Sequence, residues 1–372
     1  MIKYSFGRPK SSKTKLKKNM LSKLSTYTDN KKSDDGFTYI DVKNAPFVLG
    51  GLIDPSENGG EYYRLDASKR EDYSDANRAL AEHTTGGTIR FITDAETISL
   101  HIHNRASSTG MHHFTDRGAY GVDAYVGTGT KRSYVGKVMQ TFADSPSYNE
   151  GTIDLPKGIN EVQINLPLYG GIEKLEVGFP NGAKLGAPTE RTNKAIAFYG
   201  SSITQGGCVS RPANAYTHII CRALDADCVS YGFSGSAMGE LAVAEHIASR
   251  DLGCFVMDYD YNSPSLEHLE ATHEPFFKRI REIQPELPIV FVTHPFYSDP
   301  TEGDKARIKI VKKTYENARE NGDKNVYFVD SSDFFTKEMR DLYAVDYLHP
   351  NDLGQFSMAE VIFKAVKKAI AK

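Results

Sequence analysis

The sequence predicts a two-domain α/β protein, in which an antiparallel β domain precedes a parallel sheet with helices on both of its faces. Two observations predict this fold class. From about residue 36 to residue 185, apolar side chains recur at every second position, as they do in half-buried strands. From Ala195 onward, short apolar runs alternate with longer runs of helical periodicity, which is typical of a parallel sheet. A chain of 372 residues is long enough to bury two such cores.

The chain opens with a basic segment, which we delimit as residues 1–35. Its first 24 residues contain eight lysines and arginines and no acidic residue. We interpret this segment as a solvated leader, rather than as an arm that binds an anionic polymer or a partner subunit. The sequence leaves both interpretations open.

The alternating pattern of the first domain is clearest over residues 97–103 and 160–166. Short strands of this kind at regular intervals are typical of an antiparallel sandwich or jelly roll. The polar, turn-rich stretch 186–194 follows. It separates a β domain of residues 36–190 from a second domain of residues 191–372.

The second domain contains five predicted strands that alternate with five predicted helices. Parallel strands linked by helices form a sheet that is covered on both faces, and ligands bind at the carboxyl ends of its strands. The predicted strands span residues 195–199, 228–233, 254–259, 288–293 and 326–330, and the predicted helices span residues 215–224, 240–249, 266–283, 305–321 and 353–371.

Composition argues against several classes of partner. The net charge of −3 gives no reason to expect nucleic acid or a membrane surface, and no apolar run approaches the roughly 18 residues of a membrane-spanning helix. The first residues lack the apolar core of a secretory signal, so we expect a cytoplasmic protein. The four cysteines match no zinc-binding spacing and are interpreted as buried thiols. Exposed strand edges and the basic segment are compatible with a homo-oligomer.

Two motifs carry the chemistry of a serine esterase. Residues 200–206, Gly-Ser-Ser-Ile-Thr-Gln-Gly, follow the first strand of the second domain and place Ser202 on a strand-to-loop turn. Asp346 and His349 just precede the last helix, at a spacing that lets the carboxylate orient the imidazole. Serine alone is a poor nucleophile, so an ester hydrolase needs such a pair. The alternative for residues 200–206 is a plain strand–helix turn, whereas a P-loop is excluded because no Gly-Lys-Ser/Thr follows.

Two further polar segments follow the next strands and are predicted at the same edge of the sheet. Residues 231–236 contain Gly235, whose backbone amide suits an oxyanion donor. Residues 258–262 end in Asn262, whose side-chain amide suits the same role. Each segment alone is also compatible with an ordinary turn. The stronger signal is their order: serine, glycine, asparagine and Asp-x-x-His at successive strand ends.

This order resembles that of the SGNH hydrolases, also called GDSL esterases, over residues 195–372. The resemblance implies a three-layer α/β/α domain with a flavodoxin-like sheet and no metal or organic cofactor. An all-β domain before such a hydrolase resembles two-domain bacterial members, some of which deacetylate plant polysaccharides. The implied site residues are Ser202 as nucleophile, His349 as base and Asp346 as its partner, with the amides of Ser202 and Gly235 and the side chain of Asn262 as oxyanion donors.

Three positions depart from the family pattern. Ser201 stands where the family usually has Asp before the nucleophile, and Ser230 stands in place of the usual Asn of the second block. Asp260 replaces glycine beside the site. These departures leave the chemistry intact, but they weaken any inference about the substrate that is drawn from better-known members of the family. We expect Asp260, and His294 after the fourth strand, to contact the substrate.

Histidines of the β domain raise the alternative of a metal site. His101 and His103 share one strand face, and His112 and His113 follow in the same region. No spaced set of carboxylates or cysteines completes such a site in the sequence. We therefore predict no metal, and we interpret these histidines as a polar strand face, a domain contact or a wall over the hydrolase site.

Together these observations predict a serine carboxylic ester hydrolase that acts through an acyl-serine and needs no cofactor. Its expected substrate is an acetyl or other short acyl ester of a carbohydrate, either an oligo- or polysaccharide or a small-molecule ester. The alternatives are a lipolytic esterase or thioesterase for longer acyl chains, and a carbohydrate-binding protein with an inactive hydrolase scaffold.

Overall fold

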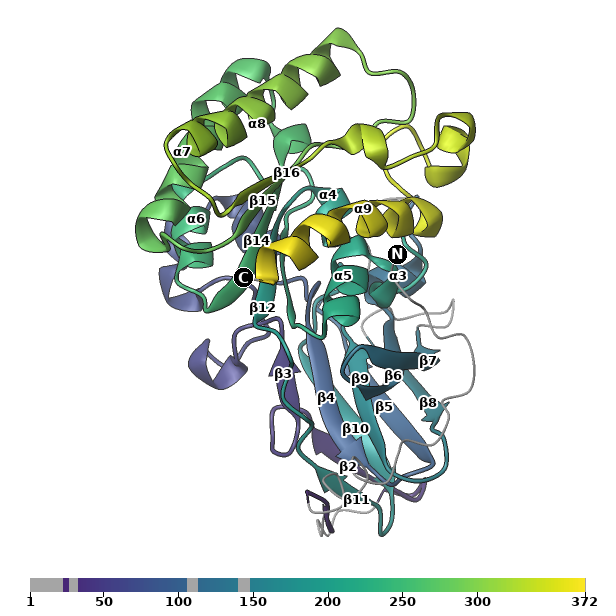
Figure 1. Cartoon of the computed structure of the whole chain (residues 1–372). Helices are drawn as coiled ribbons and strands as arrows, with labels where there is room; N and C mark the ends of the chain where they lie inside the picture. Colours follow the sequence, from purple (N-terminus) through teal and green to yellow (C-terminus); the bar gives the residue numbers. More distant parts are fainter. Residues whose placement is uncertain (1–22, 27–32, 106–112, 140–147, 372) are drawn as a thin grey trace.

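The chain folds into an antiparallel β-rich region followed by a parallel sheet flanked by helices, which confirms the predicted fold class (Figure 1). The β domain is the lower part of the figure, and the helix-covered sheet is the upper part. In the part of the chain that this computed structural model describes, no helix combines the length and the apolar character needed to cross a membrane. The described residues are 23–26, 33–105, 113–139 and 148–371.

Most of the basic segment 1–35 lies outside the described residues, and its interpretation as a leader stays a prediction. Its described part contains a strand that the sequence pattern does not predict. This strand, β1 (Ser25–Thr26), pairs antiparallel with β11 (Lys184–Gly186). Two residues are too few to show an alternating pattern, which explains the omission.

Two antiparallel sheets form the β domain. Its other strands are β2 (Phe37–Asp41), β3 (Val48–Gly50), β4 (Thr88–Thr93), β5 (Thr97–His103), β6 (Val122–Thr128), β7 (Lys131–Val138), β8 (Tyr148–Asp154), β9 (Asn160–Asn165) and β10 (Lys174–Pro180), and its helices are α2 (Asp75–Leu80) and α3 (Asp116–Tyr120). One sheet has the order β1-β11-β4-β9-β6-β7, with β3 beside β4, and the other has the order β2-β10-β5-β8. The predicted alternation of β5 holds, since Ile98, Leu100 and Ile102 are fully buried in the core of this domain.

Five parallel strands form the sheet of the second domain. They are β12 (Ala195–Gly200), β13 (Cys228–Gly232), β14 (Leu252–Asp258), β15 (Ile289–Val292) and β16 (Val326–Val329), and they agree closely with the predicted ranges. Their order is β13-β12-β14-β15-β16, so β13 lies on one side of β12 and β14 on the other. This is the flavodoxin-like order, in which ligands bind at the carboxyl ends of the strands where the chain switches sides.

Helices cover both faces of this sheet (Figure 1). One face carries α5 (Tyr216–Leu224) and α9 (Asp352–Ile370), and the other carries α6 (Leu241–Ala248), α7 (Leu266–Ile283) and α8 (Glu302–Glu320). Along β12, Ile196 and Phe198 pack with the first pair of helices, whereas Ala197 and Tyr199 pack with the other three. Because both faces are buried, the strand is apolar without alternation, as parallel strands commonly are.

Buried polar contacts join the β domain to the second domain. The guanidinium of Arg132 lies 2.8 Å from the Asp225 carboxylate, and both side chains are almost completely buried. Arg64 donates hydrogen bonds to the carbonyl oxygens of Ser230 and Gly232 at the end of β13. Buried charges are costly unless they are paired or hydrogen-bonded, so these contacts favour one fixed arrangement of the two domains.

Candidate active site

Ser202 lies at the carboxyl end of β12, where it begins a short helical turn, α4 (Ser202–Gln205). The side chain of Ser201 caps this turn by accepting a hydrogen bond from the backbone N–H two residues later. Gly200 leaves no room for a side chain, since a Cβ atom there would lie 2.2 Å from the carbonyl oxygen of Asp258. The strand therefore turns sharply and presents Ser202, which is 8% exposed, at the switch point of the sheet.

Hydrogen bonds join Ser202 to His349 and Asp346. The Oγ atom of Ser202 lies 2.9 Å from Nε2 of His349, and Nδ1 of His349 lies 3.0 Å from Oδ2 of Asp346. If the carboxylate accepts the Nδ1 proton, the lone pair of Nε2 faces the serine hydroxyl. The structure thus brings together the three residues that the sequence predicts as nucleophile, base and carboxylate.

The Asp346 carboxylate also orders the loop that carries His349. Its Oδ1 atom accepts hydrogen bonds from the backbone N–H groups of Leu348 and His349, at 2.8 and 2.6 Å. Partial burial would raise the pKa of Asp346, but these hydrogen bonds and that from the His349 ring outweigh it and lower the pKa. The carboxyl group is therefore charged at neutral pH.

The two predicted amide donors lie after β13 and β14, the neighbours of β12. Gly235 has a φ of +67°, a left-handed conformation that glycine adopts without strain. Asn262 ends a 3₁₀ turn, and its Nδ2 atom donates a hydrogen bond of 2.9 Å to the carbonyl oxygen of Phe233. A side-chain amide carries two hydrogens, so this bond orients the group and leaves one hydrogen for another acceptor.

Gln205 connects the α4 turn to the Gly235 segment, a role that the sequence pattern does not predict. Its Oε1 atom accepts the N–H of Ser234 at 3.0 Å, and its Nε2 atom donates to the carbonyl oxygen of Leu168 at 3.1 Å. Gly232 permits the close approach, because a Cβ atom there would lie 2.2 Å from the backbone nitrogen of Gln205. The only signal in the sequence is a glutamine that stands between two small residues, Thr204 and Gly206, in the turn after the strand.

The β domain supplies one wall of the site, as one interpretation of its histidines predicts. The rings of His113 and His349 lie 4.8 Å apart, and the ring of Phe114 meets His349 edge-on at 5.8 Å. Tyr169, which follows β9, donates a hydrogen bond of 3.2 Å to the backbone carbonyl of Ser202. The imidazole of His349 is therefore flanked by side chains from the other domain.

Two other histidines of the β domain, His101 and His103, lie in different surroundings. The ring of His101 stacks on Tyr39 with centroids 3.9 Å apart, and His103 packs on Tyr148 at 4.9 Å. His112 lies outside the described residues. Aromatic packing on the strand face accounts for His101 and His103.

The structure buries Asp260 and His294, the two residues that the sequence predicts as substrate contacts, and this role stays a prediction. Both residues are only 1% exposed. The Nδ1 atom of His294 lies 2.8 Å from Oδ2 of Asp260, and its Nε2 atom lies 3.1 Å from Oδ1 of Asp304. Both residues follow strands of the parallel sheet, as the sequence predicts, and in the structure their side chains contact each other and Asp304.

This buried cluster supports the turn that carries Asn262. Burial would lower the pKa of His294, but the attraction and the hydrogen bonds of Asp260 and Asp304 outweigh it, and the pKa is raised. Asp260 begins the 3₁₀ turn that ends at Asn262. The contacts of His294 with Asp260 and Asp304 therefore stabilise the turn that positions Asn262, the predicted amide donor.

We expect His294→Gln to lower the free energy of unfolding by about 3 kcal/mol, because it leaves Asp260 buried without its charged partner. A histidine with a raised pKa contributes its full stabilisation below its unfolded pKa of about 6.5 and loses it as the pH rises through the folded value. The difference between wild type and variant should therefore be widest below about pH 6.5 and should narrow at alkaline pH. Urea unfolding across this range measures it, with His103→Gln as control. A difference that widens with rising pH would contradict a charged His294.

A flavodoxin-like sheet with a hydrogen-bonded serine, histidine and aspartate at its switch point is the arrangement of a serine ester hydrolase. The second domain matches the GDSL-like lipase/acylhydrolase family, whose sequence profile covers residues 193–367. Residues 37–185 match a domain described as the N-terminus of SGNH-hydrolase-type esterases. These matches confirm the resemblance to SGNH hydrolases. A search of curated protein sequences gives no match.

Solved structures share the two-domain fold. A protein assigned as a GDSL-like lipase from Bacteroides ovatus ATCC 8483 is 24% identical, with a TM-score of 0.78 over 90% of this chain and 98% of that one. The salicylyl-acyltransferase SsfX3 from a tetracycline biosynthetic pathway is 18% identical, with a TM-score of 0.72 over 91% and 98%. An acetyl xylan esterase, Est2A, from the rumen bacterium Butyrivibrio proteoclasticus is 13% identical, with a TM-score of 0.54 over 90% and 99%. At these identities the likeness shows the fold alone.

Proposed function

We propose that the protein hydrolyses carboxylic esters through an acyl-serine on Ser202, and that its substrates are acetyl or other short acyl esters of carbohydrates. The observation that carries the reaction is the hydrogen-bonded chain from Ser202 through His349 to Asp346. The match of residues 193–367 to the GDSL-like lipase/acylhydrolase family supports ester hydrolysis. The acetyl xylan esterase of the same two-domain fold supports the choice of a carbohydrate ester.

In the proposed reaction, Nε2 of His349 takes the hydroxyl proton as Oγ of Ser202 attacks the ester carbonyl carbon. Asp346 keeps the other ring proton on Nδ1 and stabilises the imidazolium. The backbone N–H groups of Ser202 and Gly235 and one amide hydrogen of Asn262 hold the negative carbonyl oxygen. The imidazolium then protonates the leaving alcohol. Water attacks the acyl-serine with His349 again as base, and the acid leaves.

Asn262→Ala should lower kcat by about 100-fold with little change in KM, because the amide gains most of its interaction when the carbonyl oxygen becomes negative. Hydrolysis of p-nitrophenyl acetate at several substrate concentrations measures both constants. Asn321→Ala, at the end of α8, is a matched control that should behave as wild type. A higher KM with an unchanged kcat would mean that Asn262 binds the ground state and is not an oxyanion donor.

The substrate class is tested with a mixture of acetylated oligosaccharides, analysed by mass spectrometry before and after incubation. We expect loss of acetyl groups with the wild type and none with Ser202→Ala. If the acetyl groups persist while p-nitrophenyl acetate is hydrolysed, the proposed carbohydrate substrate is wrong, but the proposed ester hydrolysis is still supported. If the acyl group passes to an added alcohol and no free acid is released, the enzyme is an acyltransferase and the proposal of hydrolysis is wrong.

The two alternative functions give different results in the same assays. A lipolytic esterase or thioesterase would hydrolyse p-nitrophenyl octanoate faster than the acetate. A carbohydrate-binding protein with an inactive scaffold would hydrolyse neither ester. The intact contacts among Ser202, His349 and Asp346 favour an active enzyme over an inactive scaffold.

A further inference from the structure

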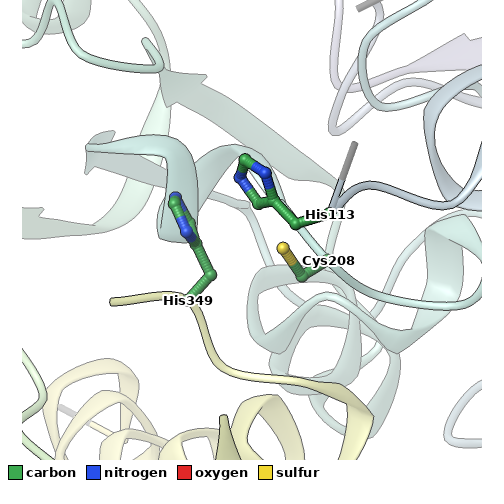
Figure 2. Close-up of side chains that lie close together, drawn as sticks. All are labelled: His113, Cys208 and His349. Atoms are coloured by element: carbon green, nitrogen blue, oxygen red, sulfur yellow. The ribbon is translucent and has the colours of Figure 1, made fainter. Parts of the chain in front are cut away.

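Three potential metal ligands lie close together in the candidate active site (Figure 2). They are His113 from the β domain, Cys208 from the segment after α4, and His349. One ligand atom from each lies within 4.8 Å of the other two. Sequence spacing hides this group, because its members are separated by 95 and 141 positions and belong to two domains.

The chemistry of this set suits a divalent cation of borderline softness. Two imidazoles and one thiolate are typical ligands of Zn²⁺, which binds them in a tetrahedral arrangement. Bonds of about 2.0 Å to nitrogen and about 2.3 Å to sulfur place the ligand atoms about 3.5 Å apart. The three side chains would therefore have to close by about 1 Å. Water or the Ser202 hydroxyl would fill the fourth position.

His349 is already oriented as a metal ligand would be. Its Nδ1 atom lies 3.0 Å from the carboxylate of Asp346, and this pairing of carboxylate, histidine and metal is common in zinc sites. The lone pair of Nε2 is then the one available to a metal. It is also the lone pair that accepts the Ser202 proton in the proposed reaction, so the two uses exclude each other.

Cys208 is held in the site by its backbone. It has a φ of +68°, which is uncommon outside glycine, and its thiol is buried. Burial, with a smaller contribution from the charge of Asp346, raises the pKa of this thiol to about 12. In the metal-free protein the group is therefore a neutral thiol and a weak nucleophile. A bound cation replaces the thiol proton, which passes to solvent.

We propose that His113, Cys208 and His349 form an inhibitory site for Zn²⁺, and that the bound ion stops ester hydrolysis by occupying the imidazole lone pair of His349. The ion takes no part in the reaction itself. The inhibition rests on the function proposed above, whereas the binding of the ion does not.

Metal binding is measured first, without reference to activity. We expect isothermal titration of the metal-free protein to show one strong Zn²⁺ site per chain, and the inactive Ser202→Ala variant to retain it. Co²⁺ in place of Zn²⁺ should give a thiolate-to-metal charge-transfer band that Cys208→Ser abolishes. A wild type and Ser202→Ala that both lack the strong site would overturn the proposal, whatever their esterase activity.

Inhibition is measured second, with each variant normalised to its own rate in a chelator. Zn²⁺ should inhibit wild-type hydrolysis of p-nitrophenyl acetate, and chelation should restore it. Cys208→Ser and His113→Gln should each require at least about tenfold more Zn²⁺. The matched controls Cys221→Ser and His103→Gln, which alter a buried thiol and a β-domain histidine elsewhere, should be inhibited as wild type is. Equal sensitivity of Cys208→Ser and wild type would overturn the assignment of the ligands.

Discussion

Ser202→Ala is expected to lower kcat by about 10⁵- to 10⁶-fold and to leave the fold intact. Alanine has no oxygen with which to form the acyl intermediate, so His349 and Asp346 lose their function together with it. A residual rate of about 10³- to 10⁴-fold over the uncatalysed reaction should persist, because the amide donors still bind the carbonyl oxygen. Hydrolysis of p-nitrophenyl acetate at saturating concentration measures the loss.

Ser201→Ala is the matched control for this variant. The Ser201 hydroxyl caps the α4 turn, so its removal should cost about 1 kcal/mol of stability and far less activity than the loss of Ser202. A fluorophosphonate that reacts with activated serines should add to Ser202 in the wild type, as peptide mass mapping can show. An adduct on Ser201, together with a larger loss of activity in Ser201→Ala than in Ser202→Ala, would assign the nucleophile to Ser201.

The fold could be predicted closely because its periodic signals are local. The predicted helix 266–283 has the bounds of α7, and the predicted strand 97–103 has those of β5. The periodic pattern of each element follows from its own burial, so consecutive residues in the sequence are enough to reveal it. The strand β1 was missed because two residues carry no period, and its pairing with β11 spans the length of the β domain.

The site could be predicted in part, for a related reason. Ser202, Asp346 and His349 lie at strand ends or before a helix, and topology alone brings such positions to one edge of the sheet. The contributions of His113 and Phe114 depend instead on how the two domains pack, which no periodicity reports. The direction of side chains in the loops likewise cannot be predicted from any periodicity in the sequence.

Asp346→Asn is expected to lower kcat by about 10³- to 10⁴-fold. The asparagine keeps an oxygen that can accept the N–H groups of Leu348 and His349, so the loop should retain its shape. Its NH₂ group, however, would face Nδ1 of His349 and donate a hydrogen bond to it. The ring proton then moves to Nε2, and the lone pair lies on Nδ1, so the nitrogen that faces Ser202 cannot accept its proton.

Asp346→Ala separates this effect on the proton from the loss of the carboxylate. The Asp346 side chain is 39% exposed, so water can replace it in the alanine variant and either tautomer of His349 can form. We therefore expect the alanine variant to lose less activity than the asparagine variant, although it disorders the loop more. Asp341→Asn, on the exposed segment that precedes the loop, should keep the wild-type kcat. If the alanine variant is instead the less active, Asp346 serves mainly to order the loop, and the position of the ring proton is set by another group.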